Sequence, residues 1–240
     1  MMEGMTVLIT GGGSGIGEAT SKLMLDNGYK VFSVGLHIPT WTHDHFQAIE
    51  LDLLDDSVTR QYAERLVEEQ DITHFVHNAG VILPNLLENM AIDDLTTLTK
   101  LHASSAAIFM QAFLPKMRAG NFGRIIFNSS RASLGMETRT AYSYSKAGII
   151  GMARSWALEF APHGITVNTV APGPILTDNF WDLVEKGGPE QEKIAAKLPV
   201  RRIGRPDDVA RAILFFADPD NSYVTGQTLY VCGGASIASG

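Results

Sequence analysis

The sequence predicts a single α/β domain, in which a doubly wound parallel sheet carries helices on both faces. Short runs rich in Val and Ile alternate along the chain with longer segments of helical periodicity. Several of the short runs are apolar almost throughout, which is typical of strands buried on both faces of a parallel sheet. A glycine-rich turn also follows the first run directly. No shift in composition marks a boundary, so we expect one domain over residues 1–240.

The elements can be justified in chain order. The first strand is the apolar-rich run 6–9, and the first helix spans 15–27 and ends before Gly28, a residue that commonly stops a helix at C′. The other strands have similar length and composition, at 30–34, 48–51, 73–77, 124–128, 165–170 and 228–231. The other helices show apolar residues at helical spacing, over 58–69, 95–118, 141–161 and 207–217.

Composition and charge exclude several classes of protein. With 19 basic and 26 acidic residues the net charge is −7, which favours neither nucleic acid nor an anionic membrane as a partner. The one cysteine, Cys232, excludes an internal disulfide framework and a cysteine-based metal cluster. The first residues do not resemble a signal peptide, and no apolar run approaches the roughly 18 residues of a membrane-spanning helix. We therefore expect a cytoplasmic protein with no membrane partner.

Residues 10–17 read Thr-Gly-Gly-Gly-Ser-Gly-Ile-Gly, between the first strand and the first helix. Their G-x-x-x-G-x-G spacing differs from the G-x-G-x-x-G fingerprint, and no Gly-Lys-Ser/Thr follows as in a P-loop. Glycine permits positive φ angles and lets the backbone approach a pyrophosphate, while the helix N-terminus offers free N–H groups. The turn predicts a dinucleotide site in a Rossmann-type fold. The alternative is a tight turn that only connects a strand and a helix.

A second group of residues indicates acid–base chemistry. Tyr142 and Lys146 stand four apart in a predicted helix and therefore share a face, so the ammonium can lie beside the phenol. A neighbouring cation favours the phenolate, which allows proton exchange with an alcohol near neutral pH. A serine at the end of a nearby strand, in Asn128-Ser129-Ser130, can hold the same substrate oxygen.

Several motifs in this order resemble those of the short-chain dehydrogenase/reductase family, in its compact form of about 250 residues. The resemblance covers essentially the whole chain. Its motifs are the glycine turn 10–17, His-Asn-Ala-Gly at 77–80, Ser130, Tyr142-x-x-x-Lys146, Pro-Gly-Pro-Ile-Leu-Thr at 172–177, and the C-terminal segments 202–210 and 225–234.

The resemblance implies a role for each residue of the acid–base group. Tyr142 would donate or accept the proton of the substrate oxygen. Lys146 would lower the pKa of that phenol and hold the nicotinamide ribose, and Ser130 would orient the substrate carbonyl. The usual serine-to-tyrosine separation selects Ser129 instead, so Ser129 stays an alternative. Hydride passes directly between the nicotinamide and the substrate carbon, and no metal is required.

The same resemblance assigns the cofactor contacts. The pyrophosphate would meet Gly11, Ser14, Gly15, Ile16 and Gly17, the adenosine would meet Leu36, Asp52, Leu53, Asn78, Ala79 and Gly80, and the nicotinamide end would meet Pro172, Gly173, Ile175 and Thr177.

The second strand ends in Gly-Leu-His at 35–37, with neither the acidic residue that meets the ribose of NAD nor the arginine that meets the phosphate of NADP. Ser14 stands where NADP-preferring relatives often carry Arg or Lys, which favours NAD slightly over NADP. His37 as a contact to the 2′-phosphate is the alternative.

His102 departs from the family pattern. Counting back from Pro115 places it where the family usually has an active-site Asn, whose backbone helps to hold a water for proton relay. We predict that His102 sustains this relay or adds a group that titrates near neutral pH. The alternative is a structural histidine whose nitrogens are satisfied by neighbours.

The substrate is expected under a lid at about 178–200, with Phe180 and Trp181 near its start and Gly187 as a possible hinge. Ser130, Arg131 and Trp181 are the predicted substrate contacts. Arg131 and Arg139 flank the active-site loop and can meet a carboxylate or phosphate, although surface or ion-paired arginines are the alternative.

The sequence therefore predicts an NAD(P)-dependent oxidoreductase that interconverts a small-molecule secondary alcohol and a ketone. A dehydrogenase of a cyclic diol or dihydrodiol is the alternative within the enzymes. A catalytically inactive dinucleotide-binding scaffold or regulator is the alternative from another class. The resemblance also implies a homotetramer, assembled through the helices at 95–118 and 141–161 and the last strand.

Overall fold

The computed structural model describes residues 4–238 and is built around one parallel sheet. Its seven strands lie in the order β3-β2-β1-β4-β5-β6-β7, so the strand order reverses between β1 and β4. The predicted doubly wound fold is confirmed. In such sheets ligands bind at the carboxyl ends of the strands beside this reversal. The strands are β1 (Thr6–Thr10), β2 (Lys30–Gly35), β3 (Phe46–Glu50), β4 (Ile72–His77), β5 (Gly123–Asn128), β6 (Ile165–Pro172) and β7 (Thr228–Val231).

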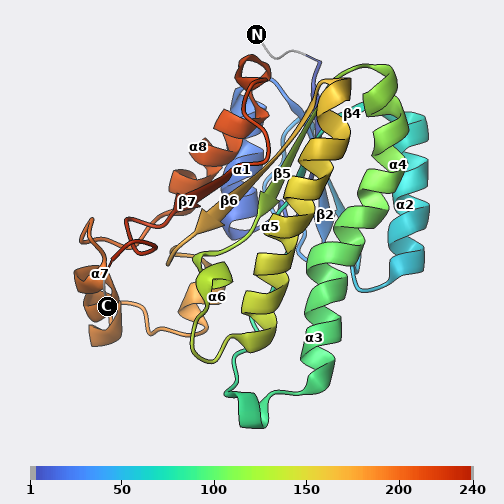
Figure 1. The fold of residues 1–240 in the computed structure, drawn as a ribbon. Coiled ribbons are helices and arrows are strands. Elements are labelled where there is room, and N and C mark those ends of the chain that lie inside the picture. The colour runs from blue at the N-terminus through green and yellow to red at the C-terminus, as the bar shows by residue number, and fades with distance from the viewer. Residues whose placement is uncertain (1–3, 239–240) are drawn as a thin grey trace.

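Helices cover both faces of the sheet (Figure 1). Helices α1 (Gly15–Asp26) and α8 (Pro206–Ala217) cover one face, and α2 (Asp56–Glu69), α4 (Ser105–Ala119) and α5 (Thr140–Phe160) cover the other. Because successive side chains of a strand point to opposite faces, β1 serves both cores. Val7 and Ile9 pack in the core that contains α1 and α8, and Leu8 packs in the core that contains α2, α4 and α5.

The predicted helix 95–118 is longer and less regular than its sequence indicates. It starts as α3 (Ile92–Thr99), passes through one π-helical turn (Lys100–Ser104) and continues as α4. Single π turns inside α-helices are frequently found at functional sites. This turn carries His102.

Other boundaries move by only a few residues, for local reasons. Helix α2 begins at Asp56, two residues before the predicted start, because the Asp55 carboxylate accepts hydrogen bonds from the backbone N–H groups of Ser57 and Val58. The predicted lid contains two short helices that its polar sequence did not indicate, α6 (Asp178–Trp181) and α7 (Pro189–Lys197). Short 3₁₀ turns lie at Leu87–Asn89, Arg131–Leu134, Ala161–His163 and Pro219–Asn221.

The connection between β2 and β3 is short and passes over the glycine turn. A Cβ on Gly13 would fall 2.4 Å from the carbonyl oxygen of His37 and 3.0 Å from Cδ of Pro39, so glycine is required for this close approach. Within residues 4–238, no helix combines the length and the apolar character that a bilayer crossing demands.

Candidate active site

Three neighbouring strands are tied together where the strand order reverses. The Thr10 hydroxyl at the end of β1 accepts hydrogen bonds from the backbone N–H groups of Asn78 (2.9 Å) and Ala79 (3.0 Å), which follow β4. The Asn78 amide donates to the carbonyls of Thr10 and Gly11, both at 3.1 Å, and accepts from the side chain of Asn128 at 2.8 Å. These bonds fix the glycine turn relative to the ends of β4 and β5.

The glycine turn has the shape that a diphosphate requires. Gly11 and Gly15 have φ values of +66° and +52°, in the left-handed region that favours glycine. A Cβ on Gly17 would lie 1.9 Å from the carbonyl oxygen of Gly11, so the turn and helix α1 can pack this closely only without a side chain there. Ser14 is the N-cap of α1 and its hydroxyl makes no capping bond to the described first turn. The backbone N–H groups of that turn can therefore receive an anion.

The segment 172–177 approaches the same turn from β6. Gly173 donates its N–H to the carbonyl of Val231 at 3.0 Å, and a Cβ on Gly173 would lie 2.9 Å from Cα of Cys232. Thr177 reaches the glycine turn, because its Cγ2 lies 3.2 Å from the position of a Cβ on Gly15. Pro172 and Ile175 are buried beside it. The structure thus brings together the residues assigned to the diphosphate and to the nicotinamide.

The residues assigned to the adenosine follow β2 and β3. Leu36 is 71% exposed just after β2, and Leu53 is buried beyond β3. Asp52 is a turn residue whose carboxylate accepts the backbone N–H of Leu54 at 2.9 Å. The end of β2 carries neither an acidic side chain nor an arginine.

Ser130 and Tyr142 are brought close together. The Ser130 hydroxyl accepts the backbone N–H of Ala132 at 3.1 Å, and it lies near enough to the Tyr142 phenol to lower the pKa of that group. Desolvation raises the pKa of the Tyr142 phenol, while the Ser130 hydrogen bond and the charge of Arg139 lower it.

Ser129 faces the other way. It is buried, and its hydroxyl donates to the backbone carbonyl of Lys146 at 2.7 Å. Of the two candidate serines, the structure places Ser130 beside the phenol and Ser129 against the backbone of α5.

Lys146 is a buried cation. It is 3% exposed, its ammonium donates to the carbonyl of Asn128 at 2.8 Å, and its Nζ lies 5.7 Å from the centre of the Tyr142 ring. Burial lowers the pKa of Lys146 to about 7. The ammonium is therefore close to its titration point at neutral pH.

His102 lies deeper, between Tyr142 and the loop after β4. Its side chain is fully buried, its ring meets the Tyr142 ring edge to face at 5.8 Å, and its Nδ1 lies 2.9 Å from the Ser145 hydroxyl. The sequence indicated neither Ser145 as a partner of His102 nor Arg139 as a charge acting on Tyr142. Both stand three residues from Tyr142, and that helical spacing is the signal by which they could have been found.

Two of the predicted substrate contacts, Arg131 and Trp181, contact parts of the chain other than Ser130 and Tyr142. Arg131 donates from Nε to the carbonyl of Ala235 at 3.2 Å, which ties the active-site loop to the segment after β7. Trp181 packs edge to face against Phe180 at 5.0 Å, and Lys186 lies 5.8 Å from the Trp181 ring. Both aromatic side chains are partly exposed, and Gly187 between α6 and α7 has a φ of +77°.

Comparison with known proteins places the chain among dehydrogenases and reductases. The family model described as enoyl-(acyl carrier protein) reductase matches residues 11–236. The BbsD subunit of (2S)-[(R)-hydroxy(phenyl)methyl]succinyl-CoA dehydrogenase from Thauera aromatica is 34% identical over 249 residues, covering 100% of this chain and 99% of the relative. The 3-oxoacyl-[acyl-carrier-protein] reductase FabG from Haemophilus influenzae is 33% identical over 245 residues, covering 99% and 100%.

Solved structures agree with this placement. A short-chain dehydrogenase/reductase family protein superposes with a TM-score of 0.87 at 30% identity, covering 99% of both chains. ElxO with NADP bound superposes with a TM-score of 0.89 at 28% identity, covering 96% of this chain and 98% of that one.

Proposed function

This chain belongs to the short-chain dehydrogenase/reductase family, and on that premise we propose that it uses a nicotinamide dinucleotide to interconvert a secondary alcohol and a ketone. The observation that carries the proposal is the contact between the Ser130 hydroxyl and the Tyr142 phenol, with the Lys146 ammonium 5.7 Å from the same ring. The glycine turn that would hold the diphosphate lies at the carboxyl end of β1, which only β4 separates from β5 in the sheet. Thr177 of the segment 172–177 reaches this turn.

The chain's own residues supply the proton and orient the carbonyl. When bound, the nicotinamide supplies hydride to the carbonyl carbon or accepts it from the carbinol carbon. In the reducing direction the Ser130 hydroxyl donates a hydrogen bond to the carbonyl oxygen, and the Tyr142 hydroxyl transfers its proton to that oxygen. The phenolate left behind is stabilised by the positive charges of Arg139 and Lys146. Alcohol oxidation runs the same proton step backwards.

The preference between NAD and NADP depends on the residues that would contact the adenosine ribose. Among the relatives described above, ElxO has NADP bound, so the slight preference for NAD that Ser14 predicts has no support from the comparisons. The end of β2 lacks an acidic side chain to accept the ribose 2′-hydroxyl and an arginine to meet a 2′-phosphate. We infer that the chain discriminates weakly between the two dinucleotides, with both binding at the glycine turn.

The substrate class to test first is a 3-oxoacyl or 3-hydroxyacyl thioester. The relatives named above act on an acyl-carrier-protein thioester and on a coenzyme A thioester. Arg131 and Arg139 stand on the loop beside Ser130 and Tyr142, where they can receive an anionic group of such a substrate. The segment 178–200 is the proposed lid. A cyclic diol would use the same Ser130, Tyr142 and Lys146.

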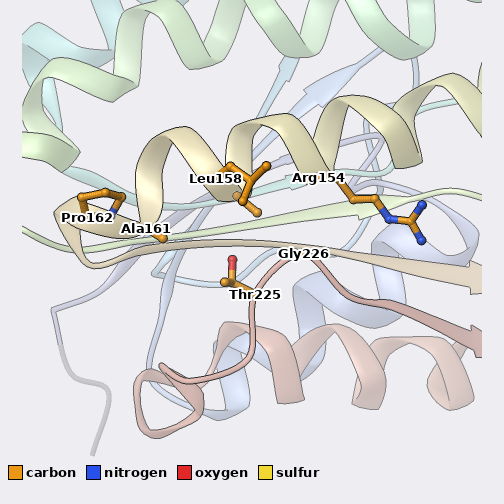
Figure 2. A pocket seen from close by; sticks show the side chains of 7 residues that line it. Arg154, Leu158, Ala161, Pro162, Thr225 and Gly226 are labelled. Atoms are coloured by element: carbon orange, nitrogen blue, oxygen red, sulfur yellow. The ribbon is translucent and has the colours of Figure 1, made fainter.

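Figure 2 shows a shallow hollow where the end of α5 meets residues 225 and 226. Its volume is about 420 Å³, and Leu158 at its rim is 82% exposed. Leu229 on β7 is also 42% exposed. We propose that a second copy of this chain covers this apolar face in a homotetramer. The lining residues are Arg154, Ala157, Leu158, Ala161, Pro162, Thr225 and Gly226.

The decisive experiment measures turnover of acetoacetyl-CoA with NADH and with NADPH, beside the Tyr142→Phe variant. We expect turnover by the wild type and a loss of at least about 100-fold in the variant, because positioned acid–base groups contribute that much. Coenzyme binding, followed by tryptophan fluorescence, should survive the substitution. Binding without turnover of any ketone or diol would favour the inactive scaffold, and binding of neither dinucleotide would overturn the proposed function.

A further inference from the structure

His102 sits at the one π-helical turn in the described chain, and it is completely buried. The π turn adds one residue to the helix at the point where it packs against α5. Its ring lies against Tyr142 and Gly80. Buried polar side chains are almost always hydrogen-bonded, so the partners of the two ring nitrogens of His102 indicate what this side chain does.

The contacts of Ser145 indicate the tautomer of this ring. A serine hydroxyl has one proton to donate, and the Tyr142 backbone carbonyl, 2.9 Å away, can only accept it. With that proton on the carbonyl, the Ser145 oxygen accepts at its 2.9 Å contact with Nδ1 of His102. In this arrangement the His102 ring carries its proton on Nδ1, and Nε2 has a free lone pair.

That lone pair faces the space beside Lys146. Nε2 of His102 is buried and has no hydrogen-bond partner within residues 4–238. A Cβ on Gly80 would fall 2.7 Å from this nitrogen and 3.2 Å from Nζ of Lys146, so both groups border the same spot. Glycine at position 80 leaves that spot open. The acceptor nitrogen of His102 and the ammonium of Lys146, both buried, thus border one small space.

Burial, together with the charge of Lys146, keeps His102 neutral. Burial lowers the pKa of His102 well below its usual value, and the positive charge of Lys146 lowers it further. His77, which faces the ring from β4, is itself neutral at neutral pH because burial lowers its pKa to about 3. Tyr142 and Lys146 face the ring from α5, and the charge of Arg139 acts on Tyr142. His102 is therefore available as an uncharged acceptor.

We propose that His102 is a positioning residue whose Nε2 accepts a hydrogen bond from the Lys146 ammonium through one bridging water, and so keeps Lys146 charged. The inference rests on the proposed function, in which that charge stabilises the Tyr142 phenolate. It differs from a relay through the imidazole, because the Nδ1 side of the ring ends at Ser145, whose proton is held by a backbone carbonyl.

The first test needs no substrate. Nitrogen NMR of the wild-type imidazoles, with His102→Gln identifying the signal, should show His102 protonated on Nδ1 and bare on Nε2 between pH 6 and 8 (roughly the range in which an ordinary histidine titrates). A proton on Nε2 would overturn the proposal. The same method reads the pKa of Lys146, which should fall by about one unit in His102→Phe, where the ring is kept and the lone pair is lost.

The second test uses turnover. His102→Phe should move the basic limb of the kcat profile to lower pH by about one unit, and His102→Gln, whose amide oxygen can accept, should largely restore it. The control is His74→Phe, because His74 is equally buried but bonds to Thr73 and the Ala217 carbonyl on the far side of the sheet. An unmoved basic limb and an unmoved Lys146 pKa in His102→Phe would contradict the inference. Failure of the wild type to turn over any substrate would instead contradict the proposed function.

Discussion

The Ser129 hydroxyl donates to the backbone carbonyl of Lys146 at 2.7 Å, whereas the adjacent Ser130 hydroxyl turns to Tyr142. Two serines next to each other in the sequence therefore have different tasks. Ser129 anchors the end of β5 to helix α5, which carries both the phenol and the ammonium. Ser130 is left free to meet a substrate oxygen.

This division predicts different kinetic effects of two alanine substitutions. Ser130→Ala should lower kcat/KM on the order of 10²-fold, because it removes a donor aimed at the substrate oxygen; the loss of its bond to the Ala132 N–H should lower stability by about 1 kcal/mol as well. Ser129→Ala should lower the free energy of unfolding by about 1 kcal/mol through the lost buried hydrogen bond, with a smaller effect on turnover. Urea unfolding and steady-state kinetics of both variants measure this. A larger kinetic loss in Ser129→Ala would reverse the assignment.

The packing of the glycine turn predicts that Gly17→Ala weakens dinucleotide binding. The new Cβ would overlap the carbonyl of Gly11 and press on the Asn78 side chain, which ties the turn to β4. Fluorescence titration with NADPH and NADH should show a loss of affinity of at least about tenfold, corresponding to about 1.4 kcal/mol.

Gly120→Ala is the matched control. Gly120 ends α4 at a φ of −80°, where alanine fits without strain and its Cβ would make ordinary contact at 3.5 Å. We expect unchanged affinity and a gain in stability of about 0.5 kcal/mol, because alanine restricts the unfolded chain. Equal affinity of Gly17→Ala and the wild type would show that this turn does not hold the dinucleotide.

The sequence alone predicts the fold and the position of the glycine turn, because these features leave local patterns in the chain. Apolar runs identify the buried strands, and the glycine spacing locates the turn at the end of β1. The π turn could not be predicted, since one extra residue at His102 hardly disturbs the apolar periodicity of a long helix. The bond from His102 to Ser145 joins residues 43 apart, so only the folded chain reveals it. The effect of burial on Tyr142 and Lys146 likewise depends on what packs over them.

The exposed apolar face in Figure 2 predicts how the oligomer can be broken. Leu158→Glu should dissociate the assembly, because it places an unpaired charge in the proposed contact between copies. Analytical ultracentrifugation at micromolar concentration measures the mass. Leu87→Glu serves as a control, since Leu87 is 68% exposed on a turn far along the chain from this face. A wild-type monomer, or a Leu158→Glu variant of unchanged mass, would contradict the homotetramer.

The buried ammonium predicts a pH dependence of stability that is specific to Lys146. Its pKa is about 7 in the folded protein against 10.5 for an ordinary lysine, so between these values the unfolded chain binds the extra proton. Stability contributed through this group must then rise with pH from about 7 to 10, by on the order of 1 kcal/mol per pH unit. In Lys146→Met the titrating group is gone, and the other ionisable groups are common to both proteins. The unfolding free energy of the wild type minus that of the variant, measured by urea titration at several pH values, should therefore increase as the pH rises. The variant should be inactive at every pH. A difference that stays flat across this range would mean that Lys146 keeps an ordinary pKa, and that its charge at neutral pH needs no support from His102.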